Sequence, residues 1–221
     1  MKVLIMIALF FTSLQCMAQV TSQTGNAKDE YLQVVNKRSE KIVATLGIPD
    51  SAWFFRVRDI IAGQYINLNT IQAAQEDKIK IIKQKEGTDK AQYDKEIKEA
   101  EGPVTQQLDS LHKIYIASLG KELDSQQIEK VKDGMTYGVL PITYKGYQEM
   151  LPDLTSEQKD TILTLLTEAR EKAMDAGSSE EKHKWFGKYK GRINNYLSAQ
   201  GYNMKKASEE WQAKIKANKS K

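Results

Sequence analysis

Apolar side chains recur along most of this chain at the three- and four-residue spacing that places them on one face of an α-helix. In residues 31–46 they mark one such helix, which Gly47 ends, and Pro49 and Asp50 form a start signal for the next. No stretch alternates apolar and polar residues convincingly, as a half-buried strand does. The pattern therefore predicts an all-α protein, a helical bundle of about six to seven helices.

Two breaks are expected in the first half of the chain. The helix that begins near residue 51 is expected to run to about residue 85 and to stop at Gly87. Residues 76–101 are poor in large apolar side chains and rich in Lys, Glu, Asp and Gln, which predicts a helical hairpin that projects from the core. Gly102 and Pro103 are expected to interrupt the returning helix, because Pro suits the first turn of a new one.

The middle of the chain is predicted to be irregular. Residues 133–152 hold three glycines, two prolines and three tyrosines. Because Gly and Pro at this density favour loops, no regular helix is expected through residues 135–142, and one helical turn is expected at 144–150. The helical pattern returns from Thr155, with further breaks at Gly177 and Gly201.

Two helix starts carry the same local signal. In each, a Leu precedes a capping residue and a Gln follows three positions after the cap, Asp124 with Gln127 and Thr155 with Gln158. The capping side chain accepts a hydrogen bond from the first turn, and the Gln side chain bonds the N–H of the cap in return. Both sites are expected to be helix N-caps.

The first 18 residues are typical of a cleavable signal peptide. Lys2 gives a positive start, residues 3–11 are apolar, and Ala18 offers a small residue at the cleavage point. The apolar run is shorter than the roughly 20 residues that span a bilayer. No later run is longer, so no transmembrane anchor is expected and the protein is predicted to be exported, to the periplasm or outside the cell.

Cys16 offers a competing interpretation as a lipid-modified residue. Lipoprotein signals generally place a small residue just before the cysteine and Leu three before it, whereas Gln15 and Ser13 stand here. This context favours plain cleavage after Ala18. The mature chain would then contain no cysteine, and packing alone would have to stabilise it.

The mature chain is expected to consist of a flexible leader, residues 19–28, and a single helical domain, residues 29–218. The full sequence has 33 Lys and Arg residues against 29 Asp and Glu residues, a net charge of +4. That balance is too near neutral to indicate nucleic acid as a partner.

Aromatic and cationic side chains lie close together in three segments and predict a shared ligand-binding surface. An aromatic face suits the C–H side of a sugar ring, and a guanidinium binds a carboxylate with a planar fork. Gly187 and Gly191 lie on another side of the same predicted helix, where a neighbouring backbone could approach closely. The alternative is that these side chains merely pack the irregular segment onto the bundle. The predicted surface comprises Trp185, Lys188, Arg192, Arg56, Arg58, Tyr137, Tyr144 and Tyr147.

The sequence predicts no catalytic residue, cofactor or metal site. His112 and His183 stand alone, without a partner at metal-ligand spacing, and both are expected at the surface. Carboxylate pairs such as Glu180 and Glu181 are common on solvated faces, which masks any glycosidase pair.

Three segments carry a resemblance to a known family: residues 53–59 (WFFRVRD), residues 137–144 (YGVLPITY) and residues 185–192 (WFGKYKGR). With them the chain resembles an uncharacterised family of secreted proteins of gut-type Bacteroidota, a domain of unknown function. That resemblance implies export and a link to polysaccharide utilisation, but no activity. Residues 154–158 (LTSEQ) are similar to the Leu-Thr-x-x-Gln motif of Spy-type periplasmic chaperones.

Three functions remain open. The first is a secreted accessory or binding protein whose partner is an anionic polysaccharide or an envelope protein. The second is a Spy-type chaperone, which would expose a concave apolar or mixed-charge surface. The third is an unrecognised polysaccharide-active enzyme, which would add close carboxylates with perturbed pKa values.

Overall fold

A computed structural model describes residues 12–85 and 89–219 of the chain. The structure is 84% helical, with no strand in the described ranges, which confirms the all-α prediction. Residues 1–11 of the predicted signal peptide and Gly87 of the predicted turn lie outside the described residues. The helices are α1 (Thr12–Val43), α2 (Ser51–Lys83), α3 (Lys90–Leu119), α4 (Ser125–Met135), α5 (Val139–Met150), α6 (Ser156–Met174), α7 (Ser179–Ala199) and α8 (Met204–Lys219).

These eight helices exceed the expected count because the segment predicted to be irregular is mostly helical. A tight turn separates α4 from α5, and Tyr137 and Gly138 adopt φ of 59° and 65° within it. Pro141 lies in the first turn of α5, where its missing N–H breaks no helical hydrogen bond. The prediction of a loop through residues 135–142 was therefore wrong beyond this short turn.

Two other expected interruptions are absent. α3 continues through Gly102 and Pro103, which are both exposed, so the carbonyl that Pro103 leaves without a donor can bond water. α1 likewise runs through residues 19–28, for which a flexible leader was predicted. A polar stretch that contains no Pro can remain helical when it is part of a longer helix, because extending a helix is easier than starting one.

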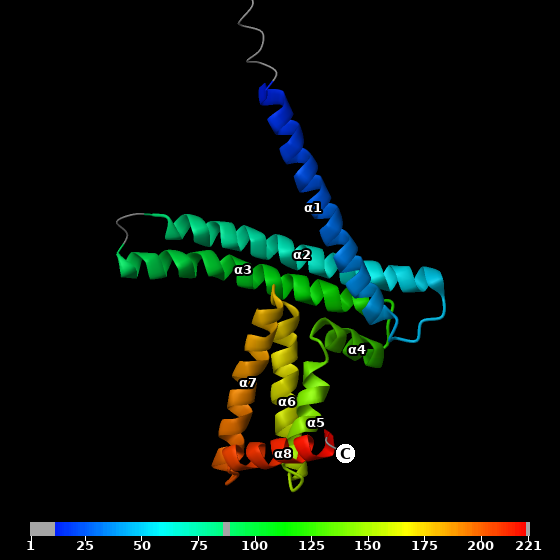
Figure 1. The fold of residues 1–221 in the computed structure, drawn as a ribbon, viewed down its shortest axis with the longest axis vertical. Coiled ribbons are helices and arrows are strands. Elements are labelled where there is room, and N and C mark those ends of the chain that lie inside the picture. Colours follow the sequence, from blue (N-terminus) through cyan, green and yellow to red (C-terminus); the bar gives the residue numbers. More distant parts are fainter. Residues whose placement is uncertain (1–11, 86–88, 220–221) are drawn as a thin grey trace, which may run out of the picture.

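The helices form two main hairpins, and the loop end of one meets the side of the other in Figure 1. α2 and α3 lie antiparallel, with α1 across the end opposite their turn, and their far halves project as an arm. α6 and α7 form the second hairpin, whose connecting loop points at the middle of the first, with α5 beside it and α8 across its base. Among the described residues between 69 and 103, none is buried.

Two apolar clusters form the core. One joins α5, α6 and α7 and includes Phe186, Tyr189, Ile193 and Leu197, which form one stripe along α7. The other joins the ends of α1, α2 and α3 to α4 around Leu119. Both predicted capping boxes are confirmed. The side chains of Asp124 and Thr155 accept from the backbone N–H groups of Gln127 and Gln158, and each Gln side chain accepts from the backbone N–H of its cap residue.

Candidate functional site

The loop between α6 and α7 docks on the middle of α2. The side-chain amide of Gln72 donates to the backbone oxygen of Asp175 at 3.1 Å. A Cβ added to Gly177 would lie 2.0 Å from Oε1 of Gln72, so a larger residue at position 177 would displace the Gln72 side chain from this contact. The docking brings side chains from four helices to one place.

A cleft of about 610 Å³ opens at this junction between the two hairpins, and we call it the junction cleft. α2 and α3 form one wall, and the end of α6 with the first turns of α7 forms the other. Its lining consists of Gln72, Gln75, Thr105, Leu108, Asp109, Lys172, Asp175, Ala176, Glu181, Lys184, Trp185 and Lys188.

The indole of Trp185 is partly buried in this wall. Nζ of Lys188 lies 5.1 Å from the centroid of the indole, and the ring of Tyr189 lies 6.5 Å away at a tilt. Because the ammonium covers the indole, a sugar can stack on that face only if Lys188 moves. The arrangement instead presents the Lys188 ammonium held against the face of the Trp185 ring.

Most acidic side chains of the cleft already have partners. Glu181 accepts from the backbone N–H groups of Gly177 and Ser178, and Asp175 pairs with His112. In the described part of the chain, neither Lys172 nor Lys188 has a carboxylate within ion-pair distance. Among the described residues, the junction cleft therefore offers two unpaired lysines, Lys172 and Lys188, beside one unpaired carboxylate, Asp109.

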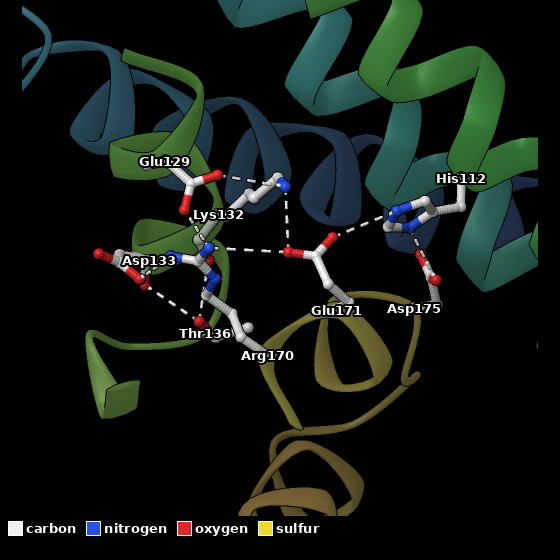
Figure 2. A network of polar contacts seen from close by, with 8 residues as sticks. All are labelled: His112, Glu129, Lys132, Asp133, Thr136, Arg170, Glu171 and Asp175. Atoms are coloured by element: carbon white, nitrogen blue, oxygen red, sulfur yellow. Dashed lines mark hydrogen bonds and ion pairs between the residues drawn. The ribbon is translucent and has the colours of Figure 1, made fainter. Parts of the chain in front are cut away.

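A polar network behind the cleft ties α4 to α6 (Figure 2). Arg170 is 3% exposed, and its guanidinium donates to Asp133 at 2.7 Å and to Glu129. Lys132 bonds Glu171 at 3.0 Å and Glu129 at 3.3 Å. A buried guanidinium is tolerated only when it is paired in this way, so the network fixes the position of α6.

His112 of α3 continues this network toward the cleft (Figure 2). Its ring nitrogens lie 2.9 Å from Asp175 and 3.3 Å from Glu171. Contacts with Asp175, and then with Glu171, raise the pKa of His112 to about 9. Although burial opposes the shift, His112 and Lys132 lower the pKa of Glu171 to about 2. At neutral pH an imidazolium therefore lies between two carboxylates.

With this geometry established, comparison with known proteins identifies the family. The model of a family of proteins of unknown function, DUF3826, matches residues 32–217. The chain belongs to the DUF3826 family. No functionally curated protein matches it. The match confirms the resemblance to a domain of unknown function that residues 53–59, 137–144 and 185–192 indicated.

The DUF3826 chain does not bring the predicted surface residues together. Trp185 and Lys188 share the junction cleft, but Tyr147 lines a different cavity, toward α8, and donates to Asn194 at 2.8 Å. Tyr144 packs against the core cluster of α5, α6 and α7. The prediction of one surface shared by these residues was wrong, because α5 lies along the length of α6 and not at its tip.

The arginines predicted for that surface also lie elsewhere in the DUF3826 chain. Arg56 pairs with Glu122 at 3.2 Å, and Arg58 pairs with Asp59 and Glu40 and lies over the ring of Phe55. Both sit at the end of α2 that is far from the arm. Arg192 lies over the Tyr189 ring and pairs with Glu168. These contacts are structural and leave no shared cleft.

Two further expectations fail for identifiable reasons. No atom of a neighbouring element lies within 4 Å of a Cβ placed at Gly187 or Gly191, so no backbone approaches there. His112 is partly buried and does not stand alone, whereas His183 is exposed as expected, with its ring stacked on Tyr137 at 5.8 Å between centroids. The i, i+4 carboxylates Glu171 and Asp175 were a sequence signal for a paired site, but nothing in the sequence pointed to their partner on α3.

In the described part of the DUF3826 chain no helix is both long and apolar enough to cross a membrane. No group of three or more His, Cys, Asp or Glu side chains among these residues has the arrangement of metal ligands.

Proposed function

We propose that this protein is an exported, non-catalytic accessory protein that binds an acidic polysaccharide in the junction cleft. The observation that carries the proposal is the pair Lys172 and Lys188, which line the cleft without carboxylate partners in the described chain. The carboxylate of a uronic acid would supply the missing charge. Lys188 is held over Trp185, which reduces the entropy that it loses when it binds.

The rest of the lining suits the hydroxyl groups of a sugar. Thr105 and Gln75 offer donors and acceptors, and the exposed carboxylate of Asp109 has no ion-pair partner among the described residues. Leu108 and the exposed part of Trp185 provide apolar contact. A cleft of about 610 Å³ has the size of sites that hold small ligands, which are typically 300–1,000 Å³.

Export is supported by the sequence alone. The positive start, the apolar run and Ala18 form the pattern of a cleavable signal. An extracellular or periplasmic position would place the cleft where polysaccharide fragments occur. The first prediction is therefore that the secreted protein begins at Gln19, and mass spectrometry of the exported chain measures this.

The binding test uses calorimetry with oligogalacturonate and with its methyl ester, which is neutral. The exported protein should bind the acid form, and the methyl ester at least tenfold more weakly. The double variant Lys172→Gln, Lys188→Gln should lose about tenfold in affinity, equivalent to about 1.4 kcal/mol. The matched control is Lys130→Gln, which changes an exposed lysine of α4 outside the cleft and should bind as the parent does.

Equal binding of the acid and the ester, or an unchanged affinity in the double variant, would remove the basis for this function. Release of shorter saccharides during the incubation would instead favour the polysaccharide-active enzyme.

A further inference from the structure

A further cavity, of about 190 Å³, lies beside the α6–α7 loop and is more enclosed than the junction cleft. α1 and α2 form one side of it, and the α4–α5 turn and the start of α7 form the other. We call it the Lys182 cavity, because Lys182 is the buried charge in its wall.

Lys182 is 5% exposed. Its ammonium donates to the backbone oxygens of Ala173 at 2.8 Å and of Met174 at 3.1 Å, at the end of α6. An ammonium has three N–H groups, and the described residues offer no third acceptor. A buried cation whose only partners are neutral carbonyls remains costly, and burial lowers the pKa of Lys182 to about 8.

Arg38 of α1 adds a second cation to the same cavity. Its guanidinium carbon lies 5.7 Å from the centroid of the Tyr65 ring, and no carboxylate of the described chain lies within ion-pair distance of it. The positive charge of Arg38 is one of the causes that lower the pKa of Lys182, after burial. The two cations are thus close enough to repel each other.

No Asp or Glu is among the described residues that line this cavity. Asp175 and Glu181 act on Lys182 through space, but the first pairs with His112 and the second caps α7. Tyrosines occur in the wall, and Val35 and Leu68 give it an apolar part. Such walls would be left uncovered by a bare inorganic ion, whereas the body of an organic acid would contact them.

We propose that the Lys182 cavity binds a small organic carboxylate, whose oxygens accept from Lys182 and Arg38 while its organic body contacts Val35, Leu68 and the tyrosine rings. The cations of the site, Lys182 and Arg38, do not line the junction cleft, although Gln72 and Ala176 lie in the walls of both. It does not depend on the proposed polysaccharide binding. The bound carboxylate would accept the third ammonium N–H and would separate the two cations.

The experiment titrates the exported protein with propionate and glucuronate, and with propionamide and glucose as neutral counterparts. The 15N resonance of the Lys182 ammonium at pH 6.5 reports occupancy, and Lys182→Met identifies that resonance. The acids should shift it in a saturable way, and the neutral molecules should not. Arg38→Gln changes an exposed side chain, so its fold is expected to persist, and it should weaken acid binding at least tenfold.

Controls separate this site from the junction cleft. Lys188→Gln should bind propionate as the parent does, and Arg38→Gln should bind oligogalacturonate as the parent does. If Lys182→Met fails to fold, Arg38→Gln alone decides the outcome. The proposal is overturned if no acid shifts the resonance, if Arg38→Gln binds as the parent does, or if inorganic phosphate binds as tightly as either acid.

Discussion

The two hairpins of this protein have the same secondary structure but very different packing. In the α6–α7 hairpin, Ile162, Leu166, Phe186, Ile193 and Leu197 are at most 1% exposed. In the far half of the α2–α3 hairpin, no described residue between 69 and 103 is buried. One hairpin is the centre of a core, and the other projects beyond it as an arm (Figure 1).

The difference shows where stability and binding reside in this fold. The arm gains from the pairing of two helices and from surface contacts such as Lys85 with Glu96, and exposed ion pairs contribute little. The α6–α7 hairpin gains from buried apolar area. Both candidate cavities lie where the α6–α7 loop meets α2, at the boundary between these two regions. A rigid hairpin thus positions the site against the start of the arm, where Gln72 and Gln75 line the cleft.

Phe186→Ala tests this contrast with the largest expected effect. The ring is 1% exposed in the core cluster of α5, α6 and α7, so its removal leaves a cavity and should lower the free energy of unfolding by about 3–5 kcal/mol. The matched change in the arm is Tyr93→Ala, which removes a partly exposed ring and should cost less than about 1 kcal/mol. Urea denaturation followed by circular dichroism measures both, and similar losses would contradict the division into core and arm.

The pH dependence of stability that His112 contributes tests the boundary between the two hairpins. Its pKa is raised from 6.5 to about 9 in the folded protein by Asp175 and Glu171. The stabilisation is therefore complete below pH 6.5 and is lost as the pH rises through 9. About a quarter of the His112 side chain is exposed to solvent, which weakens its ion pairs. The raised pKa therefore contributes on the order of 2 kcal/mol to the free energy of unfolding.

The measurement compares the parent with His112→Gln in urea at pH 6, 7, 8 and 9. The difference in unfolding free energy between the two proteins should shrink as the pH rises. The pKa of Lys182 is lowered to about 8, so its contribution to stability increases as the pH rises above 8, opposite to that of His112. Both proteins contain Lys182, so the comparison cancels this contribution. A difference that does not depend on pH would mean that His112 is not charged in the fold.

Sequence patterns predicted the local structure well and the junction poorly. The caps at Asp124 and Thr155 follow from spacing within one helix. The loop predicted around Pro141 was wrong because proline is also compatible with the first turn of a helix. Local signals of this kind identify helices but cannot decide which helices meet.

The site could be predicted only in part for the same reason. Trp185 and Lys188 were identified because they lie three residues apart on one helix. Lys172, Lys182 and Arg38 were missed, since nothing local distinguishes a lysine that faces a cavity from one on a solvated face. The contact of Gln72 with Gly177 joins residues 105 positions apart along the chain, and it is one of the long-range contacts that hold the junction together.

One helix N-cap in each region sharpens the comparison with the smallest expected effect. Thr155 caps α6 and accepts from Gln158 at 3.2 Å, while Asp89 caps α3 in the arm and accepts from Gln92 at 2.9 Å. Removing a cap costs typically about 1 kcal/mol. Thr155→Ala should lower the global unfolding free energy by that amount, because α6 cannot open without disrupting the core.

Asp89→Ala should leave the global value nearly unchanged and instead speed amide exchange in the first turns of α3. The arm can open locally, since it buries no side chain there, and local opening is measured by exchange and not by the global transition. Hydrogen exchange with mass spectrometry, run beside urea denaturation on both variants, separates the two responses. If Asp89→Ala lowered the global stability as much as Thr155→Ala, the arm would unfold together with the core and the contrast between the two hairpins would be one of shape alone.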